Sequence, residues 1–134
     1  MRDKLVIIGN GMAPGRMLEH LLKAAPERYD ITIFNAEPRV NYDRIMLSPV
    51  LSGEKEFEQI IIHGDGWYIK NGITLYKGHK ITAIDREARS VISDHGVVKC
   101  YDKLVIATGS APMILPVPGN NLAGVLTYRD LDDV

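Results

Sequence analysis

A glycine-rich turn near the N-terminus has residue types and a spacing that point to anion binding. Residues 9–15 read GNGMAPG and separate an apolar run from a helical pattern. A G-x-G pair permits a tight turn and lets the backbone approach a phosphate. The helix start behind it offers unpaired N–H groups and a partial positive charge. The turn therefore predicts a site for the pyrophosphate of a dinucleotide; the alternative is a glycine turn without a ligand.

The third glycine of this pattern is missing. It would fall at position 14, where the chain has Pro14, and Gly15 follows. Pro fits the first turn of a helix, where N–H groups are unpaired anyway, but it gives up the close helix–strand packing that glycine permits. We expect the helix either to stand slightly farther from the sheet or to approach it at Gly15.

An acidic residue follows the second apolar segment, at the place where ribose is bound in dinucleotide sites. Glu37 lies about 20 residues beyond the turn, as the pattern of these sites requires. A carboxylate there accepts hydrogen bonds from ribose hydroxyls and disfavours a 2′-phosphate. The alternative for Glu37 is a solvated loop residue.

The elements that must position these residues predict an α/β fold. The run 5–8 is apolar and rich in β-branched residues, as in a strand buried on both faces of a parallel sheet. Residues 12–25 carry apolar side chains at helical spacing, and Pro26 ends the helix. A second strand at 31–34 completes a parallel βαβ unit.

Later segments extend this unit to a Rossmann-like parallel sheet with a small antiparallel β-meander. The meander is expected to be half solvated, because its strands alternate apolar and polar residues. The expected elements are a loop with helical turns at 37–56, buried strands at 73–76 and 104–107, meander strands at 80–85, 90–93 and 97–101, and a last short strand at 125–127.

Composition excludes several function classes. The chain has 134 residues, 46% hydrophobic and 25% charged, which fits one globular domain. A formal charge of −1 provides no field to attract nucleic acid or an anionic membrane, and no apolar run reaches the roughly 18 residues of a membrane span. A single Cys excludes an internal disulfide, and the run 5–8 is too short for a secretion signal. We therefore expect a cytoplasmic protein.

The histidines give no metal signal in the sequence. His20, His63, His79 and His95 show no ligand spacing, and each is expected to be exposed.

Three segments together resemble the FAD domain of flavin-dependent pyridine-nucleotide oxidoreductases. The first is the glycine turn. The second, 101–109 (YDKLVIATG), resembles the second flavin signature of that superfamily, and 127–133 (TYRDLDD) resembles the stretch that leads into the NAD(P)H domain. Residues 8–12 and 36–44 are similar, nearly residue for residue, to the N-terminus of the large subunits of assimilatory NAD(P)H nitrite reductases.

The resemblance implies FAD as cofactor and assigns eleven residues to it. It places Gly9, Gly11, Met12 and Ala13 at the pyrophosphate, Glu37 at the adenosine ribose, Arg44 near the phosphates or the flavin edge, Ile81 at the adenine through its backbone, Ala107, Thr108 and Gly109 against the dinucleotide, and Arg129 on the FAD. The alternative for the two arginines is a surface salt bridge, and for 107–109 a strand end with a turn. Related ferredoxin reductases have Ser-Lys where this chain has Ser48-Pro49, so no lysine beside the isoalloxazine is expected.

The implied function is electron transfer from NAD(P)H through FAD to a downstream metal centre or redox partner. In this family the FAD domain is discontinuous. Residues 1–134 would be its N-terminal part, and the NAD(P)H domain and redox centre would lie downstream. The chain alone is then expected to be inactive and, because of its exposed apolar residues, prone to form a homodimer.

Three other functions remain open at this point. One is an FAD-dependent reductase of ferredoxin or rubredoxin. Another is a nucleotide-binding module without catalysis. A third, a plain NAD dehydrogenase domain, is disfavoured by the irregular stretch 38–66, where a minimal dinucleotide unit would place helices.

Overall fold

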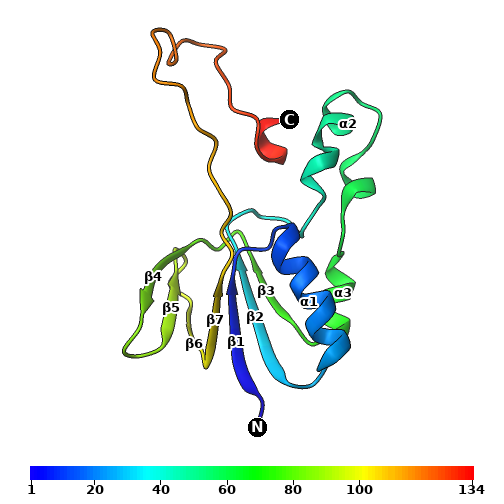
Figure 1. The fold of residues 1–134 in the computed structure, drawn as a ribbon, viewed down its shortest axis with the longest axis vertical. Helices are drawn as coiled ribbons and strands as arrows, with labels where there is room; N and C mark the ends of the chain where they lie inside the picture. Colours follow the sequence, from blue (N-terminus) through cyan, green and yellow to red (C-terminus); the bar gives the residue numbers. More distant parts are fainter.

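A parallel four-stranded sheet forms the centre of the computed structural model, which describes residues 1–134 (Figure 1). Its strands are β1 (Asp3–Ile8), β2 (Tyr29–Asn35), β3 (Thr74–Lys77) and β7 (Lys103–Ile106), in the order β3-β2-β1-β7. Central β1 pairs in parallel with β2 and with β7; Ile7 lies opposite Ile33 on one side and Val105 on the other. The expected βαβ unit and parallel sheet are confirmed.

Strand β1 is apolar throughout because both faces of the sheet are covered. Leu5 and Ile7 pack in one cluster with residues of α1 (Met12–Ala24) and α3 (Asp65–Lys70). Val6 and Ile8 pack in a second cluster, on the opposite face. Figure 1 shows the helices on one side of the sheet and the second, smaller sheet on the other.

That smaller sheet is the predicted meander. It consists of β4 (Ile81–Asp85), β5 (Ser90–Ser93) and β6 (Val98–Cys100), which pair antiparallel in this order. Its contribution to the core is Val91, which is completely buried against the main sheet. Most of β4 is exposed, so the expected half-solvated meander is confirmed.

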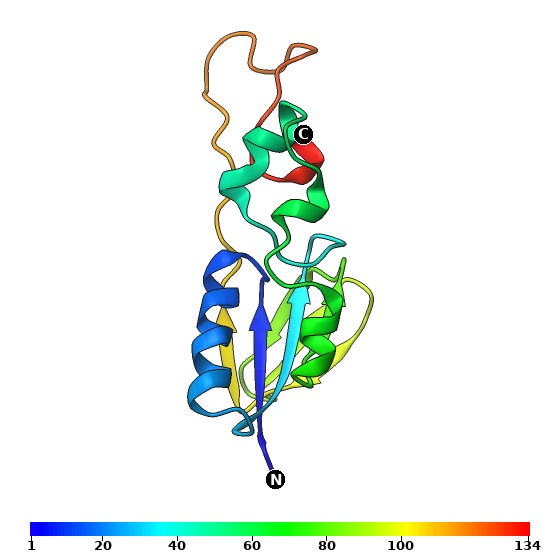
Figure 2. The ribbon, with the colours of Figure 1, turned by 90° about the vertical axis from the view of Figure 1, so that its right-hand side faces the viewer.

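The connection from β2 to β3 rises beyond the carboxyl ends of the sheet (Figure 2). It contains the 3₁₀ helix η1 (Arg44–Met46), α2 (Leu47–Leu51) and the 3₁₀ helix η2 (Phe57–Ile60). Tyr42, Leu47 and Ile60 form a third small core here, and Leu131 from the last 3₁₀ helix, η3 (Leu131–Asp133), packs against it. This layer lies above the place where the strands end.

Two predictions about the last third of the chain are corrected. The expected strand at 125–127 is wrong: this segment has no regular structure, and Leu126 is 83% exposed, because no strand lies beside it to supply hydrogen bonds. Strand β7 is present but is not buried as expected. It pairs with β1 alone, as an edge strand, and its Ile106 is 62% exposed. No helix here combines the length and the apolar character needed to cross a membrane.

Candidate functional site

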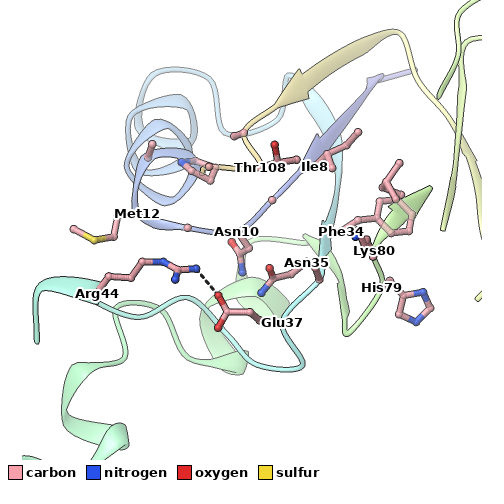
Figure 3. A pocket seen from close by; sticks show the side chains of 18 of the residues that line it. Ile8, Asn10, Met12, Phe34, Asn35, Glu37, Arg44, His79, Lys80 and Thr108 are labelled. Carbon is pink, nitrogen blue, oxygen red and sulfur yellow. Dashed lines mark hydrogen bonds and ion pairs between the residues drawn. The ribbon is translucent and has the colours of Figure 1, made fainter. Parts of the chain in front are cut away.

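A cleft of about 450 Å³ lies at the carboxyl ends of β1, β2 and β7 (Figure 3). The chain leaves β1 toward β2 on one side, and β7 lies on the other, so this is the switch point where open α/β sheets bind ligands. The eleven predicted site residues all line this cleft: Gly9, Gly11, Met12, Ala13, Glu37, Arg44, Ile81, Ala107, Thr108, Gly109 and Arg129. The structure thus brings together residues that are spread over most of the chain.

Gly9 is required by the close approach of two strand ends. Its φ is +104°, and a Cβ atom there would lie 2.1 Å from the carbonyl oxygen of Ala107. The neighbouring backbone is fixed, because Gly9 N–H donates to the Phe34 oxygen and Ala107 N–H donates to the Ile8 oxygen, both at 2.8 Å. The first glycine of the turn therefore serves the fold as much as a ligand.

Gly11 has the opposite surroundings. Its backbone is extended, with φ −80° and ψ −163°, and no atom lies within 4 Å of the position of a Cβ. Gly11 is also the N-cap of α1, where no side chain caps the helix and the first turn has no acidic residue. The start of α1 thus offers uncapped N–H groups beside open space, which is the arrangement that binds an anion.

Gly15, the first glycine after the missing third position, makes a close contact in the structure. A Cβ on Gly15 would lie 2.5 Å from Nδ2 of Asn41, so α1 makes its close approach here, to the loop after β2. Pro14 is buried in the first turn of the helix. The contacts at Gly15 are with this loop and with His63 and not with the sheet, so the expected approach of the helix to the sheet at Gly15 is not confirmed.

A buried network of polar side chains, which the sequence did not reveal, forms hydrogen bonds with Asn10 of the turn. Asn10 donates from Nδ2 to the Tyr68 hydroxyl at 3.0 Å, and that hydroxyl donates to Oδ1 of Asn41 at 3.1 Å. Burial raises the pKa of Tyr68, so it stays a donor. Asn41 Nδ2 lies 3.1 Å from Nδ1 of His63; since an amide nitrogen only donates, His63 Nδ1 accepts and its Nε2–H donates to Glu19 at 3.0 Å.

The expectation that every histidine is exposed is therefore wrong for His79, which is half-buried, and for His63. His63 is 6% exposed, and its ring stacks on Trp67 with centroids 3.9 Å apart. The network contains no buried polar side-chain atom without a partner. Its hydrogen bonds connect the turn at Asn10 with Glu19 of α1 and Tyr68 of α3.

At the edge of the cleft, the Glu37 carboxylate accepts hydrogen bonds from three side chains of the protein. Its Oε1 accepts from Arg44, and its Oε2 accepts from the Tyr42 hydroxyl at 2.7 Å and from Arg39 at 3.1 Å. Figure 3 shows Arg44 and Glu37 pointing toward each other beside the turn. A carboxylate has roughly four lone-pair sites, so these donors leave capacity for a ligand hydroxyl. Arg44 also donates to the Arg129 carbonyl at 2.9 Å.

Two of the residues that donate to Glu37, Tyr42 and Arg39, also form hydrogen bonds with the last residues of the chain. Leu131 N–H donates to the Tyr42 oxygen at 3.1 Å, and Arg39 donates to Asp132 at 2.7 Å. Burial and the Glu37 carboxylate raise the pKa of Tyr42 to about 12, so its hydroxyl remains a donor. The bond from Arg39 holds the pKa of Asp132 below its ordinary value.

The charge of the cleft favours an anion that also carries hydroxyl groups. The charged residues that line it are Glu37 and three cations, Arg44, Lys80 and Arg129. Together with the uncapped start of α1, the cations suit a phosphate chain, whereas the single carboxylate suits hydroxyl donors. His79 and Lys80 lie at the opposite end from Arg44 (Figure 3).

Comparisons with known proteins agree with this geometry. The chain is 43% identical over 132 residues to "Nitrite reductase [NAD(P)H]" of Bacillus subtilis (strain 168), covering 98% of this chain and 16% of that protein. It is 45% identical to the "Assimilatory nitrate reductase electron transfer subunit" of the same organism, covering 98% of this chain and 17% of that one. The crystal structure of NADH:rubredoxin oxidoreductase from Clostridium acetobutylicum superposes with a TM-score of 0.85 at 28% identity, over 99% of this chain and 34% of that one.

These similarities confirm the resemblance on which the sequence analysis relied. The chain spans about a sixth of the length of those two curated relatives. The family model for pyridine nucleotide-disulphide oxidoreductases matches residues 3–134. On this match, and on the sheet and cleft described above, the chain belongs to the pyridine nucleotide-disulphide oxidoreductase family.

Proposed function

We propose that this chain is the N-terminal part of a discontinuous FAD-binding domain in an NAD(P)H-dependent oxidoreductase of the nitrite reductase type. The NAD(P)H domain and a metal centre or other redox partner would lie elsewhere in the full-length protein. Two relatives named for nitrite reduction and for electron transfer in nitrate reduction support this assignment.

The observation that carries the proposal is the open N-cap of α1. Gly11 faces space that a Cβ would begin to fill, next to a helix start without a capping side chain. The cleft around it is a size typical of ligand sites and has three cations on its walls. These features fit the pyrophosphate of FAD.

Each of the other cleft residues would contact a different part of the dinucleotide. Gly9, Met12 and Ala13 would border the pyrophosphate with Gly11, and Arg44 and Arg129 would add positive charge. Glu37 would accept from the ribose, and the backbone of Ile81 would meet the adenine. Ala107, Thr108 and Gly109 would pack on the dinucleotide from the end of β7, since all of these residues line one cleft.

In this reaction the residues of the chain would bind FAD and orient it. Bound FAD supplies the conversion between two-electron transfer from a nicotinamide and single-electron transfer to an acceptor. The network below the turn keeps the start of α1 fixed, and Tyr42 and Arg39 keep the Glu37 carboxylate in place. None of the cleft residues is a cysteine, so these residues contain no dithiol relay.

A second candidate differs only in the electron acceptor. The similarity to an NADH:rubredoxin oxidoreductase favours a reductase whose acceptor is a separate small redox protein. Full-length protein that reduces nitrite with NAD(P)H would support the nitrite reductase type. Reduction of an added ferredoxin or rubredoxin, without nitrite turnover, would support the alternative.

A matched pair of substitutions tests FAD binding at the turn. Gly11 and Gly64 are both N-caps in extended conformation with no atom near a Cβ, but only Gly11 lines the cleft. In the full-length protein, Gly11→Val should weaken FAD binding at least about 10-fold, because its side chain enters the pyrophosphate space; ten-fold corresponds to about 1.4 kcal/mol. Gly64→Val should leave the affinity unchanged. Flavin fluorescence quenching measures both, and equal affinities would contradict the assignment.

A further inference from the structure

The structure brings together two histidines and an aspartate that lie outside the three segments on which the family resemblance rests. His79 lies between β3 and β4, whereas Asp94 and His95 lie in the turn between β5 and β6. One potential ligand atom from each of the three residues lies within 4.8 Å of the others. We propose that His79, Asp94 and His95 form a binding site for a divalent transition metal of the Zn²⁺ class.

The available lone pairs suit a cation. Asp94 Oδ1 takes two hydrogen bonds, from the ring of His95 at 2.9 Å and from Lys80 N–H at 3.1 Å, which leaves Oδ2 for a metal. A metal shared by Asp94 and His95 would replace the hydrogen that Nδ1 of His95 donates to Asp94 Oδ1, so that each group then offers the ion a lone pair.

Hydrogen bonds hold together the two loops that carry the proposed ligands. Asp94 N–H donates to the Lys80 oxygen at 2.8 Å, and His79 N–H donates to the Asn35 oxygen at 2.8 Å. Ser93 Oγ lies 3.2 Å from Nδ1 of His79 and accepts from the N–H of His95 at 3.3 Å. The two loops are therefore already held together in the geometry that brings the ligands close.

The rings of His79 and His95 lie next to each other, with centroids 4.2 Å apart, so the two imidazoles are close enough to bind one ion.

The donor set selects the class of metal. Two imidazoles and one carboxylate suit Zn²⁺, whose sites with three protein ligands keep a further position for water. Asp94 and His95 are exposed, with 42% and 59% of their side-chain surface accessible, so a metal has access. Of the three ligands, only His79 also lines the cleft, so the metal site adjoins the proposed FAD site at this residue.

Zinc titration of the metal-free protein tests this site directly. By isothermal titration calorimetry, Zn²⁺ should bind, and His95→Gln, His79→Gln and Asp94→Asn should each weaken this binding at least about 10-fold. Thermal unfolding should shift upward with Zn²⁺ in the unaltered protein and much less in the variants, since only the folded state presents the site. The control His20→Gln, an exposed histidine on α1, should bind Zn²⁺ normally.

The outcomes separate the alternatives. His95→Gln and Asp94→Asn alter exposed side chains, so they keep the test valid even if His79→Gln disturbs the packing of its ring beside Tyr76. No binding of Zn²⁺ by the unaltered protein would overturn the proposal. Binding that these two variants leave unchanged, or that His20→Gln removes, would overturn it as well, because the metal would then be held elsewhere.

Discussion

Replacing Gly9 with Ala should lower the free energy of unfolding by about 2–6 kcal/mol, because two separate costs add. The φ of +104° is a region that residues with a Cβ avoid, at about 1–3 kcal/mol. The new methyl group would also lie 2.1 Å from the oxygen and 2.7 Å from the carbonyl carbon of Ala107. Forcing such a contact into a packed region costs a further ~1–3 kcal/mol. Ala107 cannot simply move away, because its N–H is bonded to the Ile8 oxygen.

The matched control is Gly96→Ala. Gly96 has a φ of +75° in the turn before β6, but no atom lies within 4 Å of a Cβ there. It should therefore show the conformational cost without the steric cost. Urea unfolding followed by circular dichroism measures both variants, and Gly9→Ala should exceed Gly96→Ala by about 1–3 kcal/mol. Equal losses would refute the claim that Gly9 is needed for the contact between the ends of β1 and β7.

Three further predictions concern the cleft and its surroundings. Glu37→Ala should weaken FAD binding by the full-length protein by about 1–3 kcal/mol, as expected for loss of a hydrogen bond to a charged group, and an unchanged affinity in fluorescence quenching would rule out its ribose role. Pro14→Gly should still fold and bind FAD, but urea unfolding should show a loss of about 0.4–1 kcal/mol in the free energy of unfolding, because the unfolded chain gains conformational freedom. Loss of flavin binding would show instead that the proline shapes the site. The bond from Arg39 holds the pKa of Asp132 below its ordinary value, so the stability that this pair contributes is present above the ordinary pKa and is lost as the pH falls through the lowered pKa. Asp132→Asn should therefore flatten the acid limb of a plot of unfolding free energy against pH. An unaltered acid limb would contradict this.

The sequence alone determined the central strand, the turn and the first helix. These features depend on local patterns: a continuous apolar run at 5–8, glycines that interrupt it and helical spacing behind them. The meander was predictable for the same reason, because alternation of apolar and polar residues reports a sheet with one covered face. The resemblance to a known family then supplied the distant cleft residues, such as Ile81 and Arg129, which no local pattern connects to the turn.

Tertiary structure alone decided the features that depend on which distant segments meet. His63 was expected to be exposed, yet Asn41 and Trp67 enclose it, since its hydrogen bonds come from residues of other elements. The segment 125–127 has strand-like residues but no neighbouring strand, so its backbone cannot form a ladder.

The proposed metal ligands illustrate the same limit. His79 and His95 have no spacing that signals a site, because a sheet hairpin and not the local sequence brings them together. Spacing along the chain reports ligands only where they share one element. Pairing between strands adds contacts that depend on the register and packing of the whole fold, and these determined the polar network, the edge position of β7 and the grouping around Glu37.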